Sequence, residues 1–159
     1  MPQTTLESPQ DLLRFQLRTA LTMEDDSLAA LKELAGAARS TDVKKLFRHH
    51  QDETKEQIEN LRRVFTLLEL PESTAPSPST KGISKQAQSL LNRSAASLHD
   101  QVALSCALGN EHYEISAYQS LITAVTPVHA EAAALLQANL DQETHTSEEL
   151  LTRLQEMAG

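Results

Sequence analysis

The sequence predicts an all-α protein, a four-helix bundle in which one long connection joins the second helix to the third. Ala, Leu, Gln and Glu, all strong helix formers, dominate the composition, while aromatic residues make up 3% and Gly occurs four times. Apolar residues recur at helical spacing in four long stretches, and the only clear linker lies between the second and the third. Two short turns and one long connection are typical of a bundle with a single crossover. The 159 residues fit one domain, 1–159.

The first half predicts an antiparallel pair of long helices. Ser8 is suited to an N-cap and Pro9 to the first helical position, so we expect a helix over 9–38. After a short turn, the apolar spacing resumes in a second helix, expected over 41–70. Pro71 ends it, because proline disfavours helical geometry at the residue before it.

The second half predicts a crossover followed by another antiparallel pair. The crossover, 71–93, is rich in Pro, Ser and Thr and carries a short amphipathic helix near 83–92. The third long helix is expected over 94–126 and the fourth over 128–157, with Pro127 breaking the pattern between them. An open array of helical repeats would need at least three similar units, which the sequence lacks.

Charge and cysteine usage limit the partners and the compartment. A net charge of −8 argues against nucleic acid or an anionic membrane surface as the partner, since both require a basic face; its simplest role is solubility. Cys106 is the single cysteine, and the N-terminus lacks a signal-peptide pattern. We therefore expect a cytoplasmic protein.

Each predicted long helix interrupts its apolar stripe with a Glu near its middle. The interrupting residues are Glu24 in the first helix, His50 and Glu53 in the second, Glu111 and Glu114 in the third, and Glu143 in the fourth. Glu24 and Glu53 are 29 residues apart, as are Glu114 and Glu143, so each pair is equidistant from its turn. Residues equidistant from the turn of an antiparallel pair lie at the same height. Four carboxylates are thus expected in one layer, and a weak repeat, "QDET" at 51–54 and "DQET" at 141–144, supports this.

Four carboxylates in a core must be protonated, paired with Lys or Arg, or bound to a cation. Basic residues are absent from the neighbouring stripe positions, so a pair of divalent metal ions is the hypothesis we favour. Oxygen donors with one imidazole suit iron or manganese better than zinc. Taken singly, each Glu could instead be a solvated edge residue and His50 a hydrogen-bonded core residue. Tyr113 and Tyr118 are most simply packing residues.

Three segments resemble the ferritin-like YciF/YciE stress-protein family (DUF892), which is similar in architecture to rubrerythrin and ferritin. They are "FRHHQDETKEQIENLRRVFTLLE" (47–69), "NEHYEISAYQSL" (110–121) and "LLQANLDQETHTSEELLTRL" (135–154). The H-x-x-E-T and E-H-Y-E-I elements are the most specific, and the likeness extends over about residues 12–155.

The resemblance implies a di-iron centre between the four helices. Its ligands would be Glu24, Glu53, Glu111, Glu114 and Glu143, with His50 as the imidazole candidate. The chain departs from the broader ferritin-like pattern, which has Glu-x-x-His on two helices: "ETKE" (53–56) and "ETHT" (143–146) lack that His. A carboxylate-rich site with one His or none follows.

The implied activity is oxidation of iron(II) by dioxygen or peroxide, as a ferroxidase- or peroxidase-type oxidoreductase or in protection against oxidative stress. Two iron ions are the expected cofactors, with manganese or another divalent metal open. Tyr113 or Tyr118 could supply an electron. The alternative is a metal-free helical bundle that acts in stress or interaction through oligomerisation. A homodimer is expected; a storage cage is not, since a fifth long C-terminal helix is missing.

Overall fold

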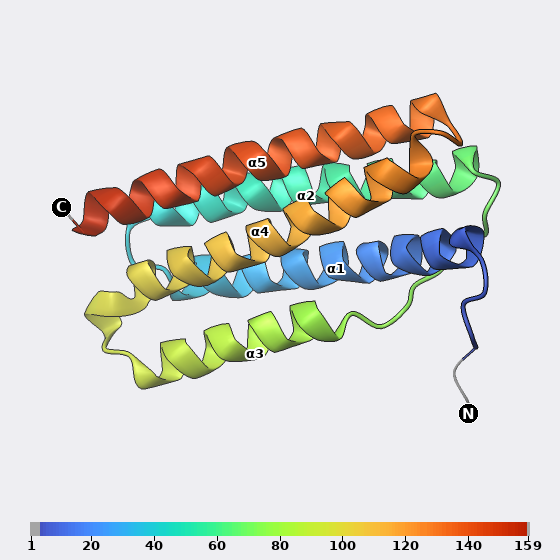
Figure 1. Cartoon of the computed structure of the whole chain (residues 1–159). Helices are drawn as coiled ribbons and strands as arrows, with labels where there is room; N and C mark the ends of the chain where they lie inside the picture. Colours follow the sequence, from blue (N-terminus) through green and yellow to red (C-terminus); the bar gives the residue numbers. More distant parts are fainter. Residues whose placement is uncertain (1–3, 159) are drawn as a thin grey trace.

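The computed structural model describes residues 4–158, and these residues are helical almost throughout. The elements are α1 (Pro9–Ala37), α2 (Thr41–Leu67), α3 (Pro78–Arg93), the 3-10 helix η1 (Ala96–Leu98), α4 (His99–Val125) and α5 (Ala130–Ala158). The four long helices run along one common axis, and α3 lies alongside them (Figure 1). The all-α prediction is confirmed. No described helix is both long and apolar enough to cross a membrane.

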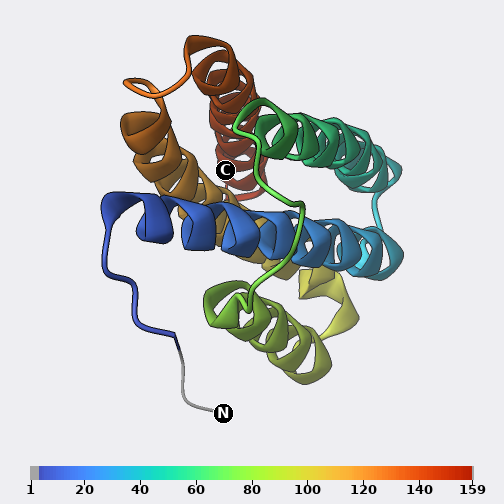
Figure 2. The same ribbon diagram turned by 90° about the vertical axis from the view of Figure 1, so that its right-hand side faces the viewer.

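Two antiparallel hairpins form the bundle. α1 packs most extensively against α2 and α4 against α5, while contacts of α1 with α4 and of α2 with α5 join the hairpins. The connection from α2 to α3 crosses over α1 (Figure 2). Two hydrogen bonds hold this crossing in place: Ala75 N donates to the Arg18 backbone O at 3.1 Å, and the Arg18 side chain donates through Nη2 to Thr74 O at 2.9 Å. The predicted topology with one long crossover is therefore confirmed.

Helix ends follow local capping chemistry. Ser8 Oγ accepts the Asp11 N–H at 3.0 Å, as expected of an N-cap. α2 ends three residues before the predicted limit of 70, since Glu69 adopts a left-handed φ of 57° and Leu70 N donates to Phe65 O at 2.9 Å. These features form a Schellman-type turn, which satisfies the last carbonyls before Pro71 is reached.

The crossover helix is longer than predicted. It begins at Pro78 rather than near 83, because proline suits the first helical position and contacts with α1 stabilise the first turn. Thr80 Oγ1 donates to Asp26 Oδ2 at 2.7 Å, and Lys81 forms an ion pair with the same carboxylate. α3 then covers parts of α1 and α4. The third long helix begins at His99, five residues later than expected, after η1.

The described core consists of two apolar clusters. One contains Leu17, Leu61, Leu121 and Leu136, and the other contains Leu31, Phe47, Leu104 and Leu150, all at most 3% exposed. Burying side chains of this size contributes roughly 1.5–3 kcal/mol each. Between the clusters, every long helix contributes buried polar residues in place of leucines. The bundle is thus stabilised from its two ends, and its middle is free to carry polar groups.

Candidate metal centre

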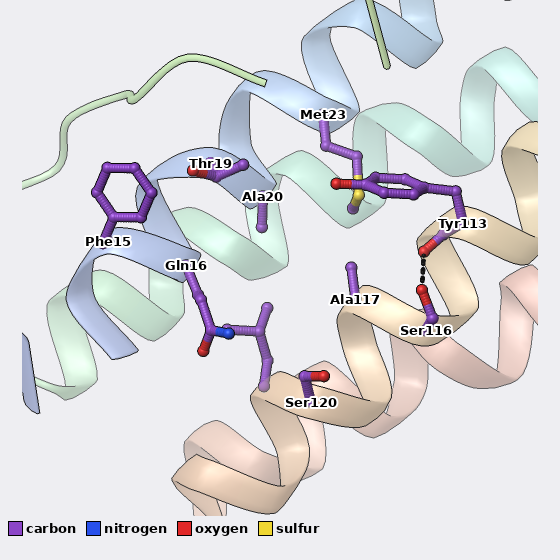
Figure 3. Close-up of a pocket in the computed structure, with 10 residues that line it drawn as sticks. Phe15, Gln16, Thr19, Ala20, Met23, Tyr113, Ser116, Ala117 and Ser120 are labelled. Atoms are coloured by element: carbon purple, nitrogen blue, oxygen red, sulfur yellow. Dashed lines mark hydrogen bonds between the residues drawn. The ribbon is translucent and has the colours of Figure 1, made fainter. Parts of the chain in front are cut away.

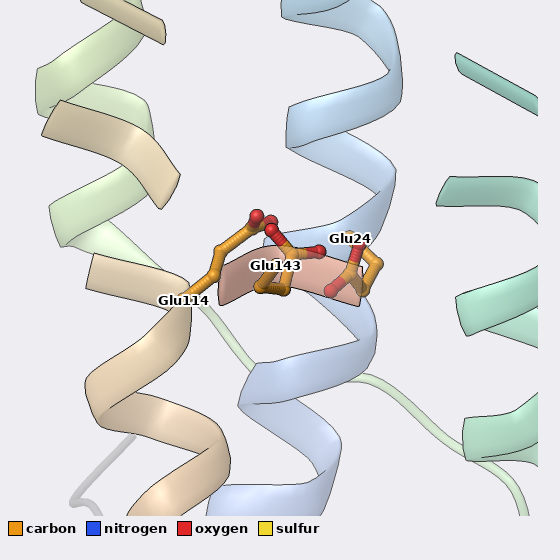
Figure 4. A group of neighbouring side chains, drawn as sticks. All are labelled: Glu24, Glu114 and Glu143. Atoms are coloured by element: carbon orange, nitrogen blue, oxygen red, sulfur yellow. The ribbon is translucent and has the colours of Figure 1, made fainter. Parts of the chain in front are cut away.

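Three buried carboxylates from three helices converge in the polar middle of the bundle. One oxygen from each of Glu24 on α1, Glu114 on α4 and Glu143 on α5 lies within 4.8 Å of the other two. Their side chains point toward one another (Figure 4), and none is more than 3% exposed. This spacing lets one divalent cation contact all three with small side-chain adjustments.

The register of α2 against α5 brings a fourth carboxylate to the same height. His50 Nδ1 on α2 lies 3.3 Å from Thr146 Oγ1 on α5. In an antiparallel pair with this register, Glu53 lies opposite Glu143. The expected layer of four Glu residues is therefore present, although Glu53 is not part of the compact group of three.

Glu53 lies at the rim of the layer beside imidazoles. Its side chain is 13% exposed, and its Oε1 is 2.9 Å from His49 Nε2 and 3.4 Å from His50 Nδ1. Partial burial raises the pKa of this carboxyl, but the contact with His50 and the charges of His50, His49 and His145 together lower it below its usual range. Glu53 is therefore a carboxylate at neutral pH.

For Glu24 the net shift of the pKa has the opposite direction. Burial is the largest cause and raises the pKa of Glu24 to about 8. The hydrogen bond from Tyr118 lowers the pKa, and the charge of Asp25 adds a smaller increase. Glu24 Oε2 is buried without a hydrogen-bond partner. The side chain is consequently neutral at pH 7 unless a cation replaces its proton.

Glu111 and Glu114, one turn apart on α4, share the environment of Glu24. Burial raises the pKa of each well above its usual range, and the charge of Glu24 raises both further. Neither oxygen of Glu114, nor Oε2 of Glu111, has a hydrogen-bond partner of normal geometry. Ser27 and Glu111 lie close enough to influence the pKa of Glu114 without forming such a bond.

None of the ion pairs within residues 4–158 involves Glu24, Glu111, Glu114 or Glu143. Of the three ways to place carboxylates in a core, pairing with Lys or Arg is therefore excluded for the described part of the chain. Protonation and cation binding remain. The buried, unpartnered oxygens fit a bound cation, since buried polar atoms are otherwise almost always hydrogen-bonded.

Only one of the two tyrosines contacts the carboxylates. Tyr118 is fully buried; its hydroxyl donates to Glu24 Oε1 at 2.7 Å and accepts from Asn139 Nδ2 at 3.1 Å. Burial, followed by the charge of Glu24, raises the pKa of the Tyr118 phenol well above its usual range. Tyr113 instead lines a surface hollow beside Met23 (Figure 3). Of the two candidate electron donors, only Tyr118 is therefore in hydrogen-bond contact with the site.

Sequence reasoning missed three buried polar residues that flank the layer, Ser27, Asn139 and Thr146. Each lies three or four positions from Glu24 or Glu143, on the same helical face. The sequence signal for these residues is therefore that the polar interruption of the apolar stripe is longer than one residue. His112 and His145 are exposed, and His145 Nε2 pairs with Glu149 Oε1 at 2.6 Å.

Comparisons with known proteins identify relatives over nearly the whole chain. The sequence profile of a family described as "Domain of unknown function (DUF892)" matches residues 8–158. No curated protein sequence matches significantly. YcfI from Rhodopseudomonas palustris, a proposed structural protein, has a TM-score of 0.91 and 28% identity, covering 96% of this chain and 98% of its own.

Two further solved structures support the fold. The E. coli stress protein YciF has a TM-score of 0.88 at 24% identity, covering 93% of this chain and 95% of its own. A protein from Xanthomonas campestris has a TM-score of 0.77 at 20% identity, covering 95% and 94%. These proteins therefore share the fold of this chain over nearly its whole length.

Proposed function

The chain belongs to the DUF892 family, and from its carboxylate layer we propose that it is a di-metal carboxylate protein that oxidises iron(II) or consumes peroxide. One observation carries the proposal: carboxyl oxygens of Glu24, Glu111 and Glu114 are buried without partners, and no basic residue in the described chain neutralises them. A bound cation removes the penalty of such groups more completely than protonation, which leaves most of the oxygens unsatisfied. A relative, YciF, is named as a stress protein, which agrees with a protective role.

Glu24, Glu114 and Glu143, which converge from three helices, would be metal ligands. Glu53 and Glu111 would complete an oxygen-rich set of ligands. Hard oxygen donors favour iron(II) or manganese(II) over softer metals. Two ions balance the charge of five carboxylates better than one does. When two iron(II) ions are bound, they supply the two electrons that reduce one peroxide, with two protons, to two waters.

His50 has the arrangement of an imidazole ligand. It is 2% exposed, its Nδ1 faces Glu53 and Thr146, and its Nε2 is buried without a partner. Metal-binding histidines generally engage one ring nitrogen in a hydrogen bond and present the other to the ion. His50 is therefore proposed as a ligand through Nε2.

The protein's own contribution is placement and exclusion of water. Tyr118 binds Oε1 of Glu24 and so leaves Oε2 for an ion. Glu111 and Glu114, one turn apart, offer alternative oxygens as the charge of the centre changes. The two apolar clusters on either side keep the layer dry, which strengthens electrostatic interactions within it.

Metal content of purified protein tests the proposal. After growth with added iron or manganese, we expect about two ions per chain. Glu53→Ala with Glu143→Ala should reduce this to near zero, whereas the exposed pair Glu148→Ala with Glu156→Ala should leave it unchanged. Stoichiometry near zero in the wild-type protein contradicts the proposal.

Thermal melting separates the proposal from a metal-free interaction bundle. A ligand that binds only the folded state raises stability, by about 2.7 kcal/mol at a hundredfold excess over Kd. We expect iron(II) or manganese(II) to raise the melting temperature of the wild-type protein but not that of the Glu53/Glu143 variant. Equal melting temperatures with and without metal would favour the interaction bundle.

A further inference from the structure

A small cavity lies between α1, α3 and α4 and reaches the carboxylates. Its volume is about 20 Å³, and Ala87 on α3 and Leu31 on α1 form part of its apolar wall. Its polar lining consists of Ser27, Ser84, Asn110 and Glu111. The crossover helix α3 therefore forms one wall of the space, and a member of the candidate metal centre lines it directly.

The size of the cavity restricts what can occupy it. A water molecule needs roughly 10–15 Å³ of such space, so this cavity suits a molecule with one or two heavy atoms. Sugars, nucleotides and other organic substrates are too large. Water, dioxygen and hydrogen peroxide are small enough to fit.

The polar wall favours an occupant that both donates and accepts hydrogen bonds. Glu111 is 3% exposed and its Oε2 lacks a hydrogen-bond partner, so it offers an acceptor. Ser27 is 2% exposed and accepts from Asn110 Nδ2 at 3.2 Å, so its own hydroxyl proton can be donated to an occupant of the cavity or to the neighbouring Glu114. Dioxygen forms only weak hydrogen bonds, whereas water and hydrogen peroxide both donate and accept them. Of these two, peroxide is the molecule with two heavy atoms and the one that can oxidise iron(II).

The one cysteine that lines the cavity does not compete for peroxide. Burial raises the pKa of the Cys106 thiol, so it remains protonated, and the thiol is a much weaker nucleophile than the thiolate. Peroxide in this cavity would therefore meet the carboxyl of Glu111 before any reactive sulfur.

A larger hollow lies between α1 and α4 and differs from this cavity in its lining. It has a volume of about 250 Å³ and is lined by Phe15, Met23, Tyr113 and Ala117 among others (Figure 3). No residue of the candidate metal centre lines it. Although this hollow is much larger than the cavity that Glu111 lines, its lining does not connect it to the carboxylates.

We propose that the cavity beneath α3 binds hydrogen peroxide, which donates to Glu111 Oε2 and accepts from the Ser27 hydroxyl. Its role as the source of oxidant rests on the proposed function, whereas the binding itself does not require a metal. α3, held by Asp26 through Thr80 and Lys81, then acts as the cover of the peroxide site.

Matched cavity-filling variants test the proposal. Ala87→Val fills the cavity beneath α3, and Ala117→Val makes the same change in the larger hollow. Crystals of metal-free protein soaked in peroxide should show a two-oxygen molecule between Ser27 and Glu111 in wild-type protein and Ala117→Val, and none in Ala87→Val. If Ala87→Val does not fold, Cys106→Leu fills the same space from α4. Absence of peroxide in the wild-type protein, or its persistence in the filled variants, would overturn the assignment.

Kinetics of the iron-loaded protein test the role of the site. We expect Ala87→Val to slow iron(II) oxidation by peroxide at least tenfold relative to Ala117→Val, with unchanged iron content. Oxidation by ferricyanide, which transfers electrons without entering the protein, should be equal in both. Equal peroxide rates would overturn the role of the cavity. Failure to load iron at all would instead contradict the proposed function and leave the crystallographic result to decide on binding.

Discussion

Glu24 and Glu53 lie at one height of the bundle on neighbouring helices, yet their surroundings give the two carboxyls opposite properties. Glu24 is fully buried, its one hydrogen bond comes from a neutral phenol, and burial raises its pKa to about 8. Glu53 is 13% exposed, and the imidazoles beside it lower its pKa despite partial burial. One layer therefore contains a neutral inner side, formed by Glu24, Glu111 and Glu114, and a charged outer side, formed by Glu53 with His49 and His50.

This difference shows how such a layer can exist before any cation binds. The inner carboxyls are protonated and so avoid mutual repulsion, while Glu53 keeps a negative charge near solvent, where a cation would be attracted. Under the proposed function, a bound cation would replace the protons on the inner side.

The largest effect is expected from Glu114→Leu on the inner side. Without metal, a leucine of similar volume removes a buried carboxyl with two unpartnered oxygens, so the free energy of unfolding should rise by about 1–4 kcal/mol. With metal, the stabilisation that we expect for the wild-type protein should be absent. Urea denaturation with and without manganese(II) measures both. Glu53→Leu is the comparison, and it should not stabilise the metal-free protein. A metal-free Glu114→Leu protein less stable than wild type would show that the inner carboxyl is not strained.

The second effect is a pH dependence of opposite sign on the two sides. The pKa of Glu24 is about 8 in the folded protein and 4.5 for an ordinary Glu, so the folded state binds its proton more tightly. The stability contribution is therefore complete below pH 4.5 and is lost as pH rises through 8. Glu53, whose pKa is lowered, contributes stability above its ordinary pKa of 4.5 and loses it as pH falls through the lower folded value.

We accordingly expect metal-free protein to lose a few kcal/mol of stability between pH 5 and pH 8, since each unit of pKa difference is worth about 1.4 kcal/mol. Glu24→Gln should flatten this decline in urea denaturation, whereas the exposed Glu148→Gln should not. A wild-type protein that is more stable at pH 8 than at pH 5 would contradict the neutral inner side.

The third effect concerns the hydroxyl that anchors the inner side. Tyr118→Phe leaves both Glu24 Oε1 and an amide proton of Asn139 without their partner, so we expect a loss of about 1–3 kcal/mol in unfolding free energy. Tyr113→Phe is the matched control, because Tyr113 lines the surface hollow, and should change stability by less than about 0.5 kcal/mol. Equal losses in the two variants would mean that the hydroxyl of Tyr118 does not hold Glu24.

The sequence was informative about the layer because helix periodicity converts spacing into height. The equal separations of Glu24 from Glu53 and of Glu114 from Glu143 placed all four on one level, and three of them meet within 4.8 Å. The same reasoning predicted the hairpins and the crossover. It relies only on regular helices and short turns, which this chain has.

Other features depend on contacts that periodicity does not encode. The start of α3 at Pro78 depends on Asp26, which lies more than fifty positions away and binds Thr80 and Lys81. The choice of Tyr118 over Tyr113 depends on which of the two points into the bundle toward Glu24 and Asn139, while the other lines the surface hollow. The separate status of Glu53 depends on His49, an exposed neighbour that gives no apolar signal. Such details require the packed side chains.

The smallest effect is expected on the outer side, from His49→Gln. His49 is 64% exposed, and exposed ion pairs contribute roughly 0.2–1 kcal/mol, so the free energy of unfolding should fall by no more than that. The pKa of Glu53 should move toward its ordinary value, because one of the imidazoles that lower it is gone. Titration of Glu53 by carbon-13 NMR measures this, with Lys55→Gln, which removes an exposed cation on the same helix, as the control. Since His50 remains beside Glu53, the carboxyl should still be ionised at pH 7. If His49→Gln made Glu53 neutral at that pH, the charge of the outer side would depend on one exposed imidazole and not on the buried His50.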